Sequence, residues 1–226
     1  MGRRRMPMSG LEHVLWIGGS PCSGKTSVAE SLATRYGLRV YHCDEHFAEH
    51  SRKATPGEQP TLWRLNQMSW DEIWMRPVDL QVQEALTVYR EEFPMIVADL
   101  LAMPRTRPIV AEGTALLPDS VAAVLNDPRR AVWLFPSEGF QRQAYPQRGE
   151  WVQAILQQCT DPEEAWERWM ERDVRFAHWV AEEARQRGYR VLWVESESSL
   201  QKGAQRIEAW FRPFIKGASH LVDIEV

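Results

Sequence analysis

The chain has few cysteines, no long apolar run and little net charge. Only three of its 226 residues are cysteine, and their spacing forms no pair typical of a metal site or a disulfide framework. No apolar run approaches the roughly 18 residues of a membrane span, and the N-terminus lacks the apolar core of a signal peptide. A net charge of −4 gives no basic field to recruit nucleic acid. We therefore expect a cytoplasmic protein with reduced thiols and neither a membrane nor a nucleic-acid partner.

The length and composition fit one globular domain with a small insert. Hydrophobic residues make up 44% of the chain and charged residues 26%, which is ordinary for a globular protein. Strand-like and helix-like segments alternate, which predicts an α/β fold with a parallel sheet and right-handed crossovers. Strands are expected at 13–17, 39–42, 108–111, 131–135 and 189–194.

The segments between these strands mostly show helical patterns. Pro94 is expected to break or kink one predicted helix, and Pro146 and Gly149 to interrupt another. A mobile loop is expected at residues 51–61. Three tryptophans in the helical region after it are expected to pack in the core of the insert: Trp63, Trp70 and Trp74. The predicted helices span 26–36, 79–102, 118–126, 137–159, 161–188 and 200–211.

One short segment carries the strongest functional signal. Residues 19–26, GSPCSGKT, match the phosphate-loop pattern GxxxxGK[ST] at every fixed position. The segment lies between a predicted strand and a predicted helix, where backbone N–H groups and the helix N-terminus can face phosphate oxygens. Lys25 is expected to reach the β- and γ-phosphates, and the Thr26 hydroxyl to ligate Mg²⁺. The expected nucleotide-binding residues are Gly19, Ser20, Pro21, Cys22, Ser23, Gly24, Lys25, Thr26 and Ser27.

Acidic residues follow two of the predicted strands, at the edge of the sheet where ligands bind. Asp44 is placed to accept the proton of an acceptor hydroxyl, and Glu112 to contact a substrate or a metal-bound water. The alternatives are a helix cap for Asp44 and a plain turn for Glu112-Gly113. Four residues near Asp44 could line an acceptor pocket, but their spacing is not that of a metal site and favours a surface histidine cluster: His42, Glu45, His46 and His50.

Arginines form a second group of charged residues. Arg168, Arg172 and Arg175 share one face of the predicted helix 161–188, and Arg142 and Arg148 lie on the helix before it. Two such helices can form a lid whose guanidinium groups neutralise a transferring phosphate. The alternative is a solvated, ion-paired face, for which glutamate partners are present at Glu163, Glu164, Glu167 and Glu171.

Four pieces of the chain together resemble the P-loop small-molecule kinases, the group around nucleoside monophosphate, shikimate and gluconate kinases and chloramphenicol phosphotransferase. They are residues 18–26, Asp44, Glu112-Gly113 and Arg172-Asp173. The resemblance implies a three-layer P-loop NTPase sandwich whose five parallel strands have the order 2-3-1-4-5. It implies a single domain over 1–226, with a helical substrate-binding insert at 45–104 and an arginine lid at about 140–175. Asp173 intrudes into an apolar stripe and is expected to pair with a neighbouring arginine.

The resemblance also implies an activity, the transfer of the γ-phosphate of Mg-ATP to a small-molecule hydroxyl. Lys25, Asp44 and Arg172 would then be catalytic, with the adenine near Arg142. The acceptor would lie against Asp44, Glu112, Gly113 and Arg148. No typical Walker B aspartate ends the third strand, which leaves the Mg²⁺ contacts beyond Thr26 open.

Other functions remain open at this point. One is a kinase of nucleotides or of polynucleotide 5′ ends, and another is an ATP-binding switch that is not a kinase. The chain has no Asn-Lys-x-Asp stretch for reading guanine and no evident arrangement for a hydrolytic water, which favours the kinase. The acceptor could be a sugar, a nucleoside, a shikimate-like acid or an antibiotic, and the sequence does not indicate an oligomeric state.

Overall fold

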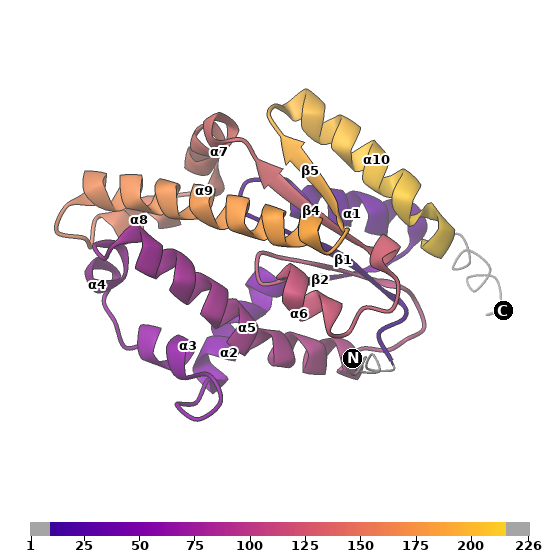
Figure 1. Cartoon of the computed structure of the whole chain (residues 1–226), viewed down its shortest axis with the longest axis horizontal. Helices are drawn as coiled ribbons and strands as arrows, with labels where there is room; N and C mark the ends of the chain where they lie inside the picture. Colours follow the sequence, from indigo (N-terminus) through magenta and orange to yellow (C-terminus); the bar gives the residue numbers. More distant parts are fainter. Residues whose placement is uncertain (1–9, 216–226) are drawn as a thin grey trace.

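The computed structural model of the chain describes residues 10–215 and centres on a five-stranded parallel sheet (Figure 1). The strands are β1 (Val14–Gly19), β2 (Arg39–His42), β3 (Ile109–Glu112), β4 (Ala131–Pro136) and β5 (Arg190–Val194). Every neighbouring pair is parallel, and the order is β2-β3-β1-β4-β5. The α/β class and the strand order 2-3-1-4-5 are therefore confirmed.

Helices connect the strands and make up most of the remaining structure. Those next to the sheet are α1 (Lys25–Tyr36), α5 (Val78–Ala102), α6 (Pro118–Ala122), α9 (Pro162–Gln186) and α10 (Glu197–Ile215). The shorter ones are α2 (Cys43–Lys53), α3 (Pro60–Leu65), α4 (Trp70–Trp74), α7 (Glu138–Ala144) and α8 (Trp151–Leu156). Two 3₁₀ turns, η1 (Pro128–Arg130) and η2 (Tyr145–Arg148), complete the described elements.

Alternating side chains of β1 divide the core between the two faces of the sheet. Val14 and Trp16 pack in a cluster with residues of α5, α6 and α9, whereas Leu15 and Ile17 pack in a second cluster with residues of α1 and α10. Successive strand residues point to opposite faces, so the two clusters lie on opposite sides of the sheet. The result is three layers, with helices on both faces, which leaves the carboxyl ends of the strands free to carry a site.

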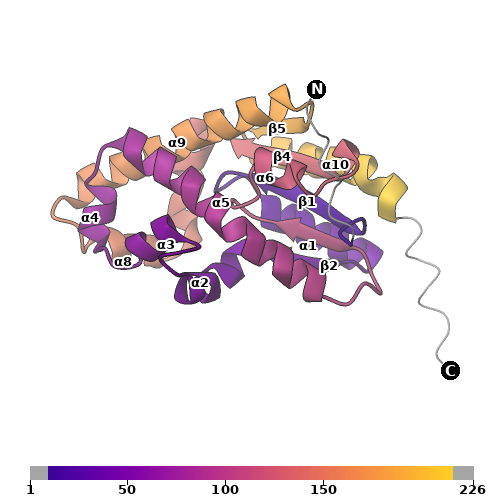
Figure 2. The ribbon, with the colours of Figure 1, turned by 60° about the horizontal axis from the view of Figure 1, so that its bottom comes forward.

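The segment α2 to α5 forms an insert that shares a core with α9. Figure 2 shows α3, α4 and α8 together at the end of the molecule beyond the sheet. Trp74 of α4 stacks on Trp169 of α9 with ring centroids 4.0 Å apart. Arg168 Nη1 donates a hydrogen bond of 2.7 Å to the carbonyl of Met75. The insert and the N-terminal half of α9 are therefore packed as one unit.

Several local predictions were wrong. Helix α2 occupies the start of the expected insert and reaches Lys53, three residues into the predicted loop. Helix α5 continues through Pro94 without a break, because Pro94 is exposed while Phe93, Ile96 and Val97 on the same helix are buried. Trp63 and Trp70 were expected in the core but are 41% and 39% exposed.

The predicted start of the helix 161–188 is confirmed, whereas the helix ends earlier, at Gln186. Asp161 accepts hydrogen bonds from the backbone N–H groups of Glu163 and Glu164, and Pro162 is the first helical residue. The interruption at Pro146 and Gly149 is also present, because η2 and a turn separate α7 from α8. No helix between residues 10 and 215 combines the length and the apolar character that crossing a membrane requires.

The backbone at Gly19 leads to a prediction about stability. A Cβ atom at this position would lie 1.9 Å from the carbonyl oxygen of Leu134, and Gly19 has a φ of +132°. Gly19→Ala should therefore lower the free energy of unfolding by about 3 kcal/mol, measured by urea denaturation. Gly139→Ala in α7 is the matched control, because no atom lies within 4 Å of a Cβ built there. An equal effect of both substitutions would contradict this prediction.

Candidate active site

The loop 19–26 joins the end of β1 to the start of α1 at the carboxyl edge of the sheet. Ser20 and Ser23 are fully buried, and Cys22 and Gly24 have left-handed φ values of 63° and 80°. Helix α1 begins at Lys25 without a side-chain cap from the described residues. Its first N–H groups are therefore available to an anion, which the positive end of the helix dipole favours.

The side chain of Lys25 points back toward the loop 19–26. Its ammonium donates a hydrogen bond of 2.7 Å to the carbonyl of Ser20, which also accepts one of 2.9 Å from the Ser23 hydroxyl. Burial lowers the pKa of Lys25, while the nearby charges of Asp44 and Glu112 oppose the shift. The predicted residues Lys25, Asp44 and Glu112 are therefore within electrostatic reach of one another.

Glu112 connects three elements at the edge of the sheet. It is the last residue of β3, in register with Ile17 of β1 and His42 of β2. Its Oε1 accepts a hydrogen bond of 3.1 Å from the Thr26 hydroxyl and lies 2.7 Å from His42 Nδ1. A buried carboxylate beside a threonine hydroxyl forms an oxygen-rich donor set of the kind that suits Mg²⁺. His42, not among the predicted site residues, fixes the carboxylate.

A cavity of about 200 Å³, here called the outer cavity, lies beside the loop. It is lined by Pro21 of the loop and by three of the predicted residues, Asp44 from α2, Arg148 from η2 and Arg172 from α9. Asp44 occupies the first turn of α2, where a carboxylate is favourable, and it is exposed. Residues distant in the sequence are thus brought to one cavity at the carboxyl edge of the sheet.

Arg172 is held in the wall of this cavity by buried partners. Its Nε lies 2.9 Å from Asp173 Oδ1, and its guanidinium lies 4.9 Å from the ring centroid of Trp74. Asp173 is 1% exposed and also accepts a hydrogen bond of 2.5 Å from the Tyr145 hydroxyl. The predicted pairing of Asp173 with a neighbouring arginine is confirmed.

The other four arginines lie in two different environments. Arg148 lies over the rings of Tyr145 and Trp151, and its Nη1 is 4.0 Å from Cys22 Sγ in the loop. The remaining three form ion pairs at the surface, Arg142 with Glu138 and Glu167, Arg168 with Glu164, and Arg175 with Asp79 and Glu171. Of the five arginines, only Arg148 and Arg172 line the outer cavity.

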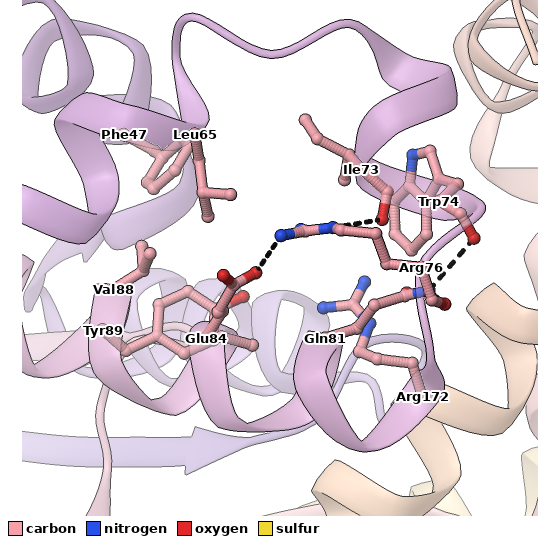
Figure 3. A pocket seen from close by; sticks show the side chains of 11 residues that line it. Phe47, Leu65, Ile73, Trp74, Arg76, Gln81, Glu84, Val88, Tyr89 and Arg172 are labelled. Atoms are coloured by element: carbon pink, nitrogen blue, oxygen red, sulfur yellow. Dashed lines mark hydrogen bonds and ion pairs between the residues drawn. The ribbon is translucent and has the colours of Figure 1, made fainter.

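A second cavity of about 230 Å³, the inner cavity, lies within the insert (Figure 3). Phe47, Tyr89 and Arg172 line both cavities, so the two adjoin. Most of its wall is apolar; Arg76 Nη1 lies 2.6 Å from Glu84 Oε2, whereas Trp74 Nε1 and Gln81 Oε1 have no hydrogen-bond partner among the described residues. The inner cavity therefore suits the apolar part of a ligand whose polar part lies in the outer cavity.

Sequence reasoning missed one charged residue that lines the outer cavity, Glu92 of α5. Glu92 is 1% exposed, and its Oε1 lies 2.9 Å from Nδ1 of His50. The other ring nitrogen of His50 lies 3.0 Å from Asp99 Oδ2, which accepts a hydrogen bond of 2.7 Å from the Tyr41 hydroxyl. His50 is 3% exposed, so its assignment to a surface cluster was wrong. One signal was available, because Glu92 lies midway between the apolar Val88 and Ile96 at i±4 spacing.

Burial raises the pKa of Glu92 to about 7; the hydrogen bond from His50 opposes the shift, and the charge of Asp44 adds to it. Against the effect of burial, hydrogen bonds from Tyr41 and His50 lower the pKa of Asp99. A carboxyl that changes charge near neutral pH therefore lies in the wall of the outer cavity.

A scan against known protein families found no matching family, and no curated protein matches the chain. No group of three or more His, Cys, Asp or Glu side chains suited to a metal ion occurs within residues 10–215. A functional assignment therefore depends on the chemistry of the loop, of Glu112 and of the two cavities.

Glu92 should make stability depend on pH. Its pKa is raised from the usual 4.5 to about 7, so the folded state binds more protons between these values and stability falls as pH rises through that window. The slope is at most about 1.4 kcal/mol per pH unit. Glu92→Gln should lose this slope in urea unfolding at pH 5 and pH 7, whereas Glu49→Gln on the exposed face of α2 should keep it. An unchanged slope in Glu92→Gln would contradict the raised pKa.

Proposed function

We propose that this protein is an ATP-dependent phosphotransferase that moves the γ-phosphate of Mg-ATP to a hydroxyl of a small-molecule acceptor. The observation that carries the proposal is a convergence at the carboxyl edge of the sheet. The loop with Lys25, the Thr26–Glu112 pair and a cavity with Asp44 in its wall all meet there. This arrangement supports a P-loop kinase domain of the kind that the sequence motifs resemble.

The residues of the loop fit a bound nucleoside triphosphate. The Ser20 hydroxyl is buried and has no hydrogen-bond partner among the described residues, and Lys25 has only the Ser20 carbonyl, a weaker partner than a phosphate oxygen. A Cβ at Gly24 would lie 2.4 Å from a methyl carbon of Leu200, and Gly24 has a φ of +80°, so a larger residue would strain the loop at this position. Thr26 and Glu112 would hold Mg²⁺, directly or through its water shell.

Mg-ATP supplies the γ-phosphoryl group, whose bond to the acceptor oxygen forms as its bond to the β-phosphate oxygen breaks and ADP leaves. Lys25 and the N–H groups at the start of α1 stabilise the charge on the phosphate oxygens. Asp44 orients the acceptor hydroxyl and takes its proton. Arg148, which lies close to Cys22 of the loop, stabilises the phosphoryl group from the side of the cavity.

The segment from η2 to α9 acts as an arginine lid in this proposal, and the insert binds the acceptor. Arg148 and Arg172 serve as the lid arginines because both line the outer cavity. Arg142 is ion-paired with Glu167 at the surface. A contact between Arg142 and the adenine of bound ATP therefore requires that the ion pair with Glu167 break. A kinase acting in the cytoplasm would find Mg-ATP there in the form the site requires.

The proposal is tested by mass spectrometry of reactions that contain Mg-ATP and pooled nucleosides, sugars, hydroxy acids and amino alcohols. A product heavier by one phosphate should appear with the natural protein. Lys25→Ala should lower its formation at least about 10³-fold, because the γ-phosphate loses a charged partner. Release of inorganic phosphate without a phosphorylated acceptor would instead indicate a nucleotide-hydrolysing switch.

Asp44 and its neighbour Glu45 provide a matched comparison. Asp44→Asn should lower the rate of phosphate transfer by about 10²-fold or more while leaving ATP affinity nearly unchanged, as expected for a general base. Glu45→Gln should change neither, because Glu45 is exposed and does not line the outer cavity. Both quantities can be measured by coupled ADP release and by titration calorimetry. Equal losses of binding and turnover in Asp44→Asn would reduce Asp44 to a structural helix-end residue.

A further inference from the structure

Charges in the wall of the outer cavity are separated by sign. Arg148 and Arg172 come from the side formed by η2 and α9, and Asp44 and Glu92 from the side formed by α2 and α5. Arg172 is neutralised by the buried carboxylate of Asp173. The acidic side has no comparable cation among its lining residues. A ligand that spans the cavity therefore meets acid on one side and arginine on the other.

Glu92 retains a free hydrogen-bonding atom. Its Oε1 is engaged by His50, but its Oε2 is buried and has no hydrogen-bond partner within residues 10–215. A buried carboxylate oxygen without a partner is costly, so a ligand that supplies a donor gains the energy of that hydrogen bond without having to displace another partner. Glu92 lines the outer cavity, so a bound acceptor can supply the donor.

Two aromatic rings accompany these carboxylates. Phe47 lies three residues after Asp44 on α2, and Tyr89 lies three residues before Glu92 on α5, and all four side chains line the outer cavity. Carboxylates together with aromatic faces favour an organic cation, which the rings attract through their quadrupoles. They disfavour a second anionic group at this side of the cavity.

We propose that the acceptor is an amino alcohol, whose ammonium group binds Glu92 and whose hydroxyl faces Asp44. The assignment of the hydroxyl rests on the proposed phosphotransferase function, whereas the binding of the ammonium does not. Any apolar part of such a molecule can pass Phe47 and Tyr89 into the inner cavity. Of the acceptors left open by the sequence, this inference excludes the shikimate-like acids and favours compounds with an amine.

The pH dependence of this binding follows from the groups around Glu92. His50 and Asp44 face it from α2, and Asp99 acts on it from further along α5, where it also binds Tyr41 of β2. Burial keeps part of the Glu92 population protonated at neutral pH. Ammonium binding requires the ionised form, so affinity for an amine should rise as pH increases through about 7.

Three matched probes test the inference by titration calorimetry without ATP. They share a phenyl ring and a benzylic hydroxyl and differ in one group: 2-amino-1-phenylethanol is cationic, 1-phenylethane-1,2-diol is neutral and mandelate is anionic. At pH 8 the amine should bind at least about tenfold more tightly than the diol, and mandelate should bind most weakly. Between pH 8 and pH 6 the preference for the amine should shrink up to about tenfold.

Glu92→Gln should remove both the preference and its pH dependence, whereas Glu49→Gln should keep both. A thermal melt checks that each variant folds, and the pH series on the natural protein does not depend on any variant. Equal affinity for amine and diol at pH 8, tighter binding of mandelate, a preference that survives Glu92→Gln, or no binding of any probe would each overturn the inference. A preference for the amine that depends on Glu92, without phosphate transfer, would support the ammonium site and contradict the kinase. Phosphate transfer to a neutral acceptor, without that preference, would support the kinase and contradict the ammonium site.

Discussion

One buried carboxylate, Glu112, fixes the geometry on which the site depends. The register of the parallel sheet places it next to His42, and its Oε1 contacts both His42 and the Thr26 hydroxyl. The end of β3, the start of α1 and the start of α2 are therefore held around one oxygen atom. Asp44 comes two residues after His42. The contact between Glu112 and His42 therefore also fixes the position of Asp44, which lines the outer cavity, relative to the loop 19–26. A change at Glu112 would disturb the proposed metal site and the proposed acceptor site together.

On the opposite wall of the outer cavity, a buried group holds segments of the chain together in the same way: Arg172, Asp173 and Tyr145. It joins α9 to η2, and the contact of Arg172 with Trp74 extends it to the insert. Buried charges are tolerated only when they are paired, so these segments are held in one arrangement and not merely placed near each other. The outer cavity thus has a basic wall fixed by Asp173 and an acidic wall fixed by His50 and Asp99. This separation of charge underlies the inference that the acceptor is cationic.

The alternating pattern of strands and helices predicted the five strands, and the family resemblance predicted their order. The loop 19–26, Asp44, Glu112 and Arg172 were named from the sequence, and they lie at or beside the loop and the outer cavity. Helix α2 was missed because only Cys43 and His50 are buried in it, too few to form an apolar period. The spacing of Glu92 between apolar residues indicated that it is buried, but its partner His50 comes from α2, a tertiary contact that local patterns do not encode. The break expected at Pro94 is absent because core burial on both sides of it outweighs the lost hydrogen bond.

A crystal structure of the protein with Mg²⁺ and a non-hydrolysable ATP analogue would show directly which atoms face the phosphates. We expect the β- and γ-phosphates to lie in the loop 19–26 and Lys25 to turn from the Ser20 carbonyl to a phosphate oxygen. We also expect Mg²⁺ beside the Thr26 hydroxyl, with Glu112 in contact through the metal or its water shell. A nucleotide bound elsewhere, or a Lys25 that stays on the Ser20 carbonyl beside a bound nucleotide, would contradict the proposed function.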